Sequence, residues 1–309
     1  MRRRPRRALM TPAGWTGLVV VTGFVILALA GSWLARYRVA ALSGDPLMPP
    51  GSDHWLGTNS VGQDLASQLL AGARASMLVA LLGGGATVAL ATAAGALAGW
   101  CGGLVDAVIM RVVDVGLVVP TIPLLVVVGA YVRPSLLSLA AIIAIISWPL
   151  HARVIRAQVL SLRHRAHLQA SVGFGASTGH VLRRHVLPES SLVIAATFIR
   201  AAERAIALET GLAFLGLSIS THGSWGTTMR DAIDFHGLPL TRAWSWWLLP
   251  PVVAVSLVLA ALALIGTSLE ERVNPRLSRH RGDRIMGTSP VPDAGNSLAP
   301  DAAGAGTTA

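Results

Sequence analysis

The stretch 169–188, QASVGFGASTGHVLRRHVLP, lies between two long apolar parts of the chain. Its GASTG segment at 175–179 fits the G-x-S-x-G pattern of a serine-hydrolase nucleophile elbow, with Ser177 as the nucleophile. Such an elbow needs a strand before the serine and a helix after it. The preceding residues, 151–171, are instead rich in Leu, Ala and Arg, which favour a helix. The sequence therefore argues against a catalytic Ser177.

Two helices joined by a sharp turn account better for the same stretch. Gly175 suits the left-handed position that ends many helices, and Ser177 or Thr178 suits the N-cap of the helix that follows. We expect an uninterrupted helix over 152–171 before the turn. Pro188 is expected to stop the second helix and to begin the next apolar segment. The result is a rigid elbow that could sit in a pocket of another protein.

The composition indicates a membrane protein. Of the 309 residues, 53% are hydrophobic and 13% are charged, whereas a soluble domain carries about 25% charged residues. The mean hydropathy is +0.60. The formal net charge is +10, and the chain contains no lysine, so arginines supply all of the basic residues.

The residue types present argue against an enzyme. A P-loop needs the lysine of G-x-x-x-x-G-K-[ST] to reach nucleotide phosphates, so the chain has no such site. Gly173, Gly175 and Gly179 do not have the spacing of a dinucleotide site. The one cysteine, Cys101, excludes an intramolecular disulfide and a cysteine metal cluster. We expect no catalytic residue, cofactor or metal, and a partner must hydrolyse any ATP that the protein uses.

Apolar segments predict six transmembrane helices, because a bilayer core of about 30 Å needs about 20 apolar residues in a helix. The expected spans lie at about 16–34, 76–100, 115–132, 135–150, 191–219 and 244–269. Glycines and alanines in the second span allow close helix packing. The predicted fold class is therefore an all-α membrane protein with a cytoplasmic elbow.

Arginines predict that both termini are cytoplasmic. Clusters of arginines precede the first span, follow the fourth span and follow the sixth, and the positive-inside rule assigns these regions to the cytoplasm. They are Arg2, Arg3, Arg4, Arg6 and Arg7; Arg153, Arg156, Arg163, Arg165, Arg183 and Arg184; and Arg272, Arg276, Arg279, Arg281 and Arg284. Six spans also return the chain to the side on which it began. The predicted location is the plasma (inner) membrane.

We divide the chain into four regions. These are a basic cytoplasmic N-terminus (1–13), a first transmembrane helix with an external loop (14–71), a core transmembrane domain (72–269) and a cytoplasmic tail (270–309). The tail is expected to be disordered from about residue 284, because its residues are small, polar and rich in proline. A cleaved signal peptide ending near Ala28-Leu29-Ala30 is an alternative for the start. It is disfavoured because the apolar run is long and cleavage would leave an odd number of spans.

The stretch 169–188 resembles the motif E-A-A-x3-G-x9-I-x-L-P of the permeases of binding-protein-dependent ABC importers. The matching positions, at the family spacing, are Gln169, Ala170, Ser171, Gly175, Leu187 and Pro188. Three residues depart from the motif: Gln169 replaces Glu, Ser171 replaces Ala and His185 replaces Ile.

Other segments resemble the dipeptide, oligopeptide and nickel branch of this family. The sequence HWLGTNSVGQD at 54–64 is similar to H-P-L-G-T-D-x-x-G-R-D, with Asn59 and Gln63 in place of Asp and Arg. GGLVDAVIMRVVDV at 102–115, LETGLAFLGL at 208–217, GSWGTTM at 223–229 and VNPRL at 273–277 also resemble branch segments. The RHVLP ending at 184–188 is typical of the branch. The resemblance covers about residues 15–277.

The resemblance implies a type I permease fold and a set of partners. These are a second permease, giving a heterodimer, two cytoplasmic ATPases and an external solute-binding protein. Residues at about 166–180 would form the coupling elbow that enters a groove on an ATPase. The implied coupling residues are Gln169, Ala170, Ser171, Gly175, Ser177, Leu187 and Pro188. Because Gln169 lacks the charge of the family's Glu, we expect weakened or re-tuned coupling.

Charged residues in the fifth span point to a second functional region. Arg200, Glu203 and Arg204 share one helical face, and Glu209 follows within the same apolar run. Counted from residue 191 at about 1.5 Å per residue, Arg200 is expected near the bilayer midplane. Such charges usually face a cavity or a partner. They form local ion pairs, or they line the translocation path and meet a charged substrate, or the boundary of the span is shifted along the chain.

Other interpretations concern the surface and the transport class. The external acids Asp53, Asp64, Asp231 and Asp234 either meet a binding protein or are simply solvated. The terminal arginines are expected to touch anionic lipid headgroups rather than nucleic acid. A secondary transporter or a channel acting without ATPases is the alternative class, as is an importer of nickel or another solute. The secondary transporter or channel is disfavoured by the basic elbow and by the lack of visible inverted repeats.

Overall fold

The computed structural model describes residues 10–131, 135–217 and 223–273. These ranges contain many helices, two isolated bridges and no strand, as the all-α prediction required. The predictions for the arginines at positions 2–7 and for the tail from residue 274 onward lie outside the described residues.

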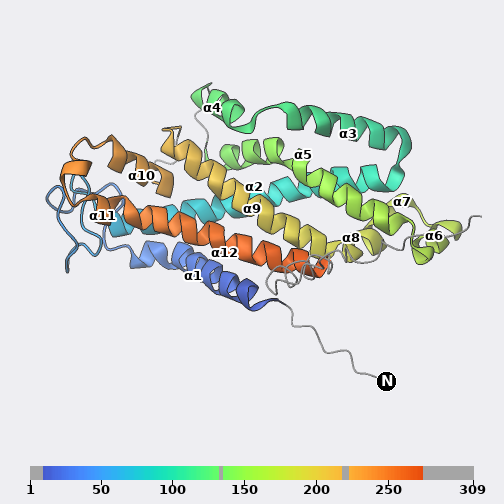
Figure 1. Ribbon diagram of the computed structural model, residues 1–309, viewed down its shortest axis with the longest axis horizontal. Coiled ribbons are helices and arrows are strands. Elements are labelled where there is room, and N and C mark those ends of the chain that lie inside the picture. Colours follow the sequence, from blue (N-terminus) through green and yellow to red (C-terminus); the bar gives the residue numbers. More distant parts are fainter. Residues whose placement is uncertain (1–9, 132–134, 218–222, 274–309) are drawn as a thin grey trace, which may run out of the picture. The chain divides into compact units, whose positions relative to one another are not determined.

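The long helices run side by side over much of their length (Figure 1). They are α1 (Pro12–Leu34), α2 (Leu65–Cys101), α3 (Gly103–Val118), α5 (Leu136–Arg163), α9 (Ser191–Phe214) and α12 (Leu249–Val273). The shorter helices are α4 (Thr121–Tyr131), α6 (Ala166–Gly173), α7 (Thr178–Val181), α8 (Leu187–Glu189), α10 (Trp225–Asp234) and α11 (Trp244–Trp247), with a π-helix at Leu182–Val186 and a 3-10 helix at Leu238–Leu240. We name the end of the bundle with α6, α7 and α8 the elbow end, and the end with residues 35–64, α10 and α11 the loop end (Figure 1).

Helix α2 lies at the centre and contacts α1, α5 and α9. Glycines allow these contacts to be close. A Cβ added to Gly84 would lie 2.9 Å from the backbone N of Ala202 in α9, and one added to Gly95 would lie 2.6 Å from the carbonyl O of Ala152 in α5. The expected close packing of the second span is therefore present.

The helices differ in length, and the difference creates a stalk. Helix α1 has 23 residues and α2 has 37, which correspond to about 34 and 55 Å at 1.5 Å per residue. At the loop end, Gly31 of α1 packs on Leu70, the sixth residue of α2. Almost all of the excess length of α2 therefore projects from the elbow end, where it packs along α5.

The third predicted span is not a straight helix over 115–132. The chain forms α3 and α4, which are bent by 80° at a short break that contains Pro120. Proline has no amide hydrogen to continue the helix. Helix α3 begins earlier than predicted and is joined to α5 by the ion pairs Asp106–Arg156 and Asp114–Arg153. The fourth predicted span also continues well past residue 150, to Arg163.

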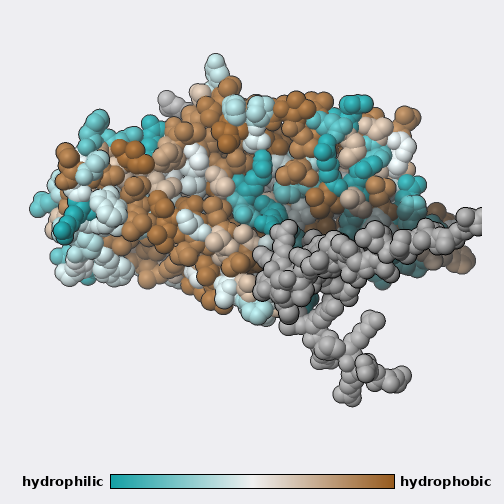
Figure 2. Space-filling view, in the orientation of Figure 1, coloured by the Kyte–Doolittle hydropathy of each residue, from teal (hydrophilic) through white to brown (hydrophobic). Residues whose placement is uncertain are grey.

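Four helices in the described ranges are long and apolar enough to cross a membrane, and the bent pair α3–α4 would be a fifth span. Apolar residues cover much of the visible face between the two ends, and hydrophilic residues gather toward the ends (Figure 2). This distribution matches a multi-pass membrane protein.

A buried polar pair lies at the loop end. His54 Nδ1 lies 3.0 Å from Asp64 Oδ1, and the ring of His54 stacks on Tyr37. Asp64 is 2% exposed and caps α2 by accepting from the amide of Ser67 at 2.8 Å. The expectation that Asp64 is solvated or meets a binding protein is therefore wrong. Its carboxylate is needed to cap a helix.

Candidate functional site

The elbow begins with a break that the sequence analysis did not predict. Helix α5 ends at Arg163, and Arg165 has an extended conformation with φ −74° and ψ 134° before α6 begins. The predicted continuous helix over 152–171 is therefore wrong. The break allows Leu162 and Leu168 to enter the same core cluster, and both are fully buried. Tertiary burial outweighs the helix propensity of the segment here.

The turn after α6 has the predicted geometry. Gly175 has φ +86°, in the left-handed region that favours glycine. The Ser177 hydroxyl accepts a 3.4 Å hydrogen bond from the amide of His180 and so caps α7. Gly175 as the turn residue and Ser177 as the cap are both confirmed.

Pro188 does not stop the second helix, which corrects the prediction. A π-helix at Leu182–Val186 precedes it, and Pro188 occupies the first turn of α8. Proline is tolerated in a first turn because its missing amide hydrogen is not required there. The preceding π-helix changes the local bonding pattern, and such segments often occur at functional sites. The backbone at Val186, Leu187 and Ser190 stays in the right-handed helical region up to α9.

Fully buried residues fix the elbow to the stalk. Leu168, Val181 and Val186 are 0% exposed and pack with residues of α2 and α5 such as Trp100 and Val159. At the surface, Arg165 Nη1 donates to Glu189 Oε2 at 2.8 Å, and the ring of His167 lies 2.7 Å from Glu189 Oε1. The elbow is thus fixed to the stalk rather than tethered by a flexible loop.

The outer face of the elbow is exposed and partly apolar. Of the predicted coupling residues, Gln169, Ala170, Gly175, Ser177 and Pro188 are exposed, and Ser171 and Leu187 are half-buried. The sequence analysis missed Phe174, which is 92% exposed beside the turn, and Val172, which is 49% exposed. The sequence does contain a signal for Phe174. It is a large aromatic residue directly before the turn glycine, where the helix has ended and cannot bury the side chain.

Basic residues gather on the neighbouring α7 and π-helix. Ser177, Gly179, His180, Arg183 and Arg184 line a shallow hollow on α7 and the π-helix. The rings of His180 and His185 lie 6.2 Å apart in an edge arrangement. An exposed apolar tip with a basic surround suits a partner groove that is apolar inside and acidic at its rim.

Arg200 lies beside the last turn of α12, near the elbow end of that helix. Its guanidinium donates to Glu270 Oε1 at 2.9 Å and to Glu203 Oε2 at 3.1 Å. Glu270 belongs to the last turn of α12, close to Ser268, on which Gly14 of α1 packs. The midplane position stays a prediction. Relative to its neighbours, Arg200 lies level with the ends of α1 and α12 rather than with their centres, because the first turns of α9 run along the stalk.

Arg204 points to a different neighbour. Its Nη2 donates to Thr121 Oγ1 at 3.2 Å, at the bend between α3 and α4. Within the part of the chain that the structure describes, its buried Nε has no hydrogen-bond partner, and neither does Nε2 of the buried His151 in α5. The charge of Arg204 is within electrostatic range of this imidazole. Two unsatisfied polar groups therefore lie between α4, α5 and α9.

Glu209 is separated from the other three charges. It is 6% exposed and accepts hydrogen bonds from the hydroxyls of Ser76 at 3.1 Å and Thr210 at 3.3 Å. Ser224, the N-cap of α10, lies close to this carboxylate. The carboxylate therefore joins α2 and α9 beside the start of α10.

Comparisons with known proteins agree on one family. The family described as the inner membrane component of binding-protein-dependent transport systems matches residues 91–279, which include the elbow and α9.

Similarity to individual proteins extends along most of the chain. The chain is 34% identical to the oligopeptide transport system permease protein OppC of Mycobacterium bovis over 276 residues, which cover 87% of this chain and 92% of that protein. It is 29% identical to the dipeptide transport system permease protein DppC of Bacillus subtilis over 277 residues, which cover 89% and 85% of the two chains. The oligopeptide permease protein OppC of Bacillus subtilis is 27% identical over 267 residues, or 85% of each chain.

Proposed function

Because the chain belongs to the family of binding-protein-dependent transport system inner membrane components, we propose that it is the permease subunit of an ATP-driven importer of peptides. The relatives described above are named for dipeptide and oligopeptide transport. The apolar helices make the chain a multi-pass membrane protein. We place it in the plasma membrane with both termini in the cytoplasm, so the elbow end is the cytoplasmic end.

We propose six membrane spans. Helix α9 is one of them, and its hydropathy alone does not identify it as a span. Helix α9 has 24 residues and lies against α2, α12 and α5 in the bundle. Its charges exclude it from a hydropathy criterion, yet Arg200 and Glu203 are paired and Glu209 is held by hydroxyl groups. Paired charges that face other helices are tolerated in a membrane. Helices α1, α2, α3–α4, α5, α9 and α12 then give six spans.

The elbow is the part that we propose binds an ATPase subunit. The observation that carries this proposal is Phe174, 92% exposed at the tip of an elbow whose base is fully buried. An exposed large aromatic on a rigid support is typical of an interface hot spot. In this arrangement Phe174 and Val172 enter an apolar groove, and the arginines beside them meet acids at its rim.

The stalk provides a route from the ATPase to the membrane. The elbow packs on the projecting ends of α2 and α5 through Leu168, Val181 and Val186. A movement of the elbow therefore moves these helix ends as one body. Partner ATPases hydrolyse the ATP, and a second, different permease completes the path. The solute-binding protein docks at the loop end.

Gln169 lies on the exposed side of α6 and can meet the ATPase only as a neutral hydrogen-bonding group. We propose that this contact tunes the coupling. Unchanged peptide-stimulated ATP hydrolysis in a Gln169→Ala complex would reject this role.

Among the charges of α9, Arg204 is the one that we propose for the translocation path. Arg200 and Glu203 already form ion pairs, and Glu209 is enclosed by hydroxyls. Arg204 has an unsatisfied Nε and lies at the α3–α4 bend. A peptide carboxylate could satisfy this donor during passage.

Binding of the isolated partner ATPase to the full-length permease in nanodiscs tests the elbow proposal. Phe174→Ala should weaken the association by about 2 kcal/mol, or roughly 30-fold, as for a truncated hot spot. Leu240→Ala is the matched control, because Leu240 is 89% exposed at the loop end and should leave ATPase binding unchanged. Equal ATPase binding by the wild type and Phe174→Ala would contradict the proposal.

A further inference from the structure

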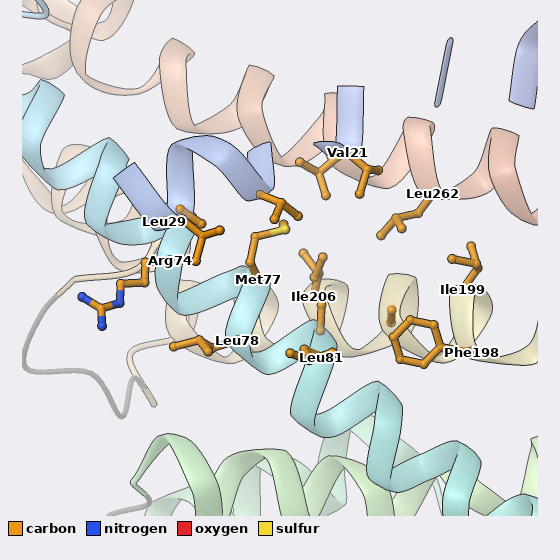
Figure 3. A pocket seen from close by; sticks show the side chains of 15 residues that line it. Val21, Leu29, Arg74, Met77, Leu78, Leu81, Phe198, Ile199, Ile206 and Leu262 are labelled. Atoms are coloured by element: carbon orange, nitrogen blue, oxygen red, sulfur yellow. The ribbon is translucent and has the colours of Figure 1, made fainter. Parts of the chain in front are cut away.

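An apolar cavity of about 480 Å³ lies between α1, α2, α9 and α12 (Figure 3). Its lining includes Val25, Leu29, Leu81, Phe198 and Leu262, and Arg74 is the one charged residue among the lining residues. Ligand pockets usually have volumes of about 300–1,000 Å³. The cavity is thus large enough for a small ligand, and its lining requires that ligand to be apolar over most of its length.

The cavity opens at an apolar part of the surface of the bundle. Leu29 is 74% exposed and Leu81 is 59% exposed, and both lie in helices long and apolar enough to span a membrane. Exposed leucines at such a depth contact hydrocarbon rather than water. A ligand can therefore enter from the lipid phase.

The length of the cavity suits an extended chain. Arg74 and Leu81 are separated by about 10 Å along α2, and Ile206 and Phe198 by about 12 Å along α9, at 1.5 Å per residue. Gly84 of α2 lies against Ala202 of α9. The stretch of α9 from Ile206 to Phe198 therefore begins about where the stretch of α2 from Arg74 to Leu81 ends, and it extends the cavity toward the elbow end. The total of about 20 Å exceeds the half-thickness of the hydrocarbon core, about 15 Å.

Arg74 stands at the loop end of the cavity with its charge unused. It is exposed and forms no ion pair with any carboxylate in the described ranges. Figure 3 shows its guanidinium directed away from the apolar side chains. The neighbouring Leu29 is five residues, or about 7.5 Å, from the end of α1. A long arginine stem that leans toward the start of its helix can bring the charge to the headgroup level.

We propose that the cavity holds one acyl chain of a phospholipid whose phosphate is bound by Arg74. The ligand needs an anion at one end and about 20 Å of hydrocarbon beyond it, and a phospholipid has both. A peptide would leave its amides unsatisfied against this lining. A helix of another protein is about 10 Å across, too wide to enter the cavity, and could lie only over its opening. The bound lipid fills the space between α1 and α9 and stabilises the contact of α1 with the bundle.

The test uses the full chain, purified in detergent and delipidated. Dioleoylphosphatidylglycerol is titrated while native mass spectrometry counts the bound lipids and thermal unfolding is followed. The wild type should bind one lipid tightly, and this binding should raise its Tm. Arg74→Gln should bind it about fivefold more weakly, since one arginine near a charged headgroup contributes about 1 kcal/mol. Arg111→Gln, the matched control, removes an exposed arginine of α3 outside the cavity and should bind as the wild type does.

Two further experiments distinguish a bound lipid from other occupants of the cavity. Met77→Trp fills the centre of the cavity (Figure 3) and should abolish the tight lipid while Arg74 remains. Inorganic phosphate should not raise the Tm. The proposal is overturned by equal lipid binding in wild type and Arg74→Gln, or by stabilisation with phosphate alone. It is also overturned if Leu81→Cys crosslinks to the second permease in the assembled complex. None of these readouts depends on an ATPase.

Discussion

Arg200 and Glu270 join α9 to the last turn of α12 through two hydrogen bonds, from Nε to Oε1 at 2.9 Å and from Nη2 to Oε2 at 3.2 Å. Gly266 of α12 lies directly beside the guanidinium, and a Cβ added there would approach Arg200 Nε to 3.1 Å. The pair thus links the last membrane helix to the helix that leads out of the elbow.

Breaking this pair should destabilise the bundle modestly. The side chains of Arg200 and Glu270 are 32% and 44% exposed, so solvent screens the pair and we expect a coupling energy of about 0.5–1 kcal/mol. A double-mutant cycle with Arg200→Gln and Glu270→Gln, followed by unfolding in mixed micelles, measures it. The more exposed pair Arg230–Asp234 is the control and should give less. A coupling energy no larger than that of the control would contradict the role of the pair.

Two adjacent glycines of α2 should respond in opposite ways to alanine. A Cβ on Gly84 meets the backbone N and Cα of Ala202 at 2.9 and 3.0 Å, whereas one on Gly85 has no atom within 4 Å. Gly84→Ala should destabilise the fold by about 1–3 kcal/mol because α2 and α9 must separate. Gly85→Ala should be neutral or stabilising by up to about 1 kcal/mol, since alanine favours the helix. Similar unfolding free energies for both variants would show that this contact is not close in the membrane.

The turn glycine of the elbow forms a second matched pair with a glycine outside the elbow. Gly175 has φ +86°, and no atom lies within 4 Å of an added Cβ at Gly175 or at Gly211. Gly175→Ala therefore introduces backbone strain alone, about 1–2 kcal/mol, while Gly211→Ala, in α9 and away from the elbow, introduces none. We expect Gly175→Ala to lower peptide-stimulated ATP hydrolysis of the assembled importer and Gly211→Ala to leave it unchanged. Equal activities would mean that the shape of the turn does not matter for coupling.

Arg204 should affect transport more than assembly. Arg204→Ala removes the contact with Thr121 and the unsatisfied donor, and we expect uptake of a labelled peptide to fall at least tenfold, the effect of about 1.4 kcal/mol at the barrier. Thr121→Val removes the same hydrogen bond but keeps the charge, and should retain more uptake. Copurification of the partner subunits reports assembly. Normal uptake by a normally assembled Arg204→Ala complex would exclude Arg204 from the path.

Local signals in the sequence predicted the elbow in part. Gly175 and Ser177 have their predicted roles, because a left-handed turn and an N-cap depend on the residue itself and its immediate neighbours. The break at Arg165 carries no glycine or proline and arises from the burial of Leu168, a tertiary effect. Pro188 misled the prediction because a π-helix before it keeps the chain helical.

The level of Arg200 relative to α12 shows the limit of counting along one helix. The count assumed that α9 enters the bilayer at its first residue, but α2, α5 and α9 share a projecting stalk that only packing reveals. The helix that each charged residue of α9 contacts also depends on tertiary packing. Arg200, Arg204 and Glu209 contact α12, α4 and α2 respectively, and no spacing in the sequence distinguishes these neighbours.

Uptake of a labelled peptide into proteoliposomes tests the central claim most directly. The permease is reconstituted with its second permease, the ATPases and the binding protein, with ATP on the elbow side and peptide on the other. We predict uptake that requires ATP and the binding protein and that Phe174→Ala reduces strongly. Peptide uptake by the permease without ATP or ATPases, or full ATP-driven uptake by Phe174→Ala, would contradict the account.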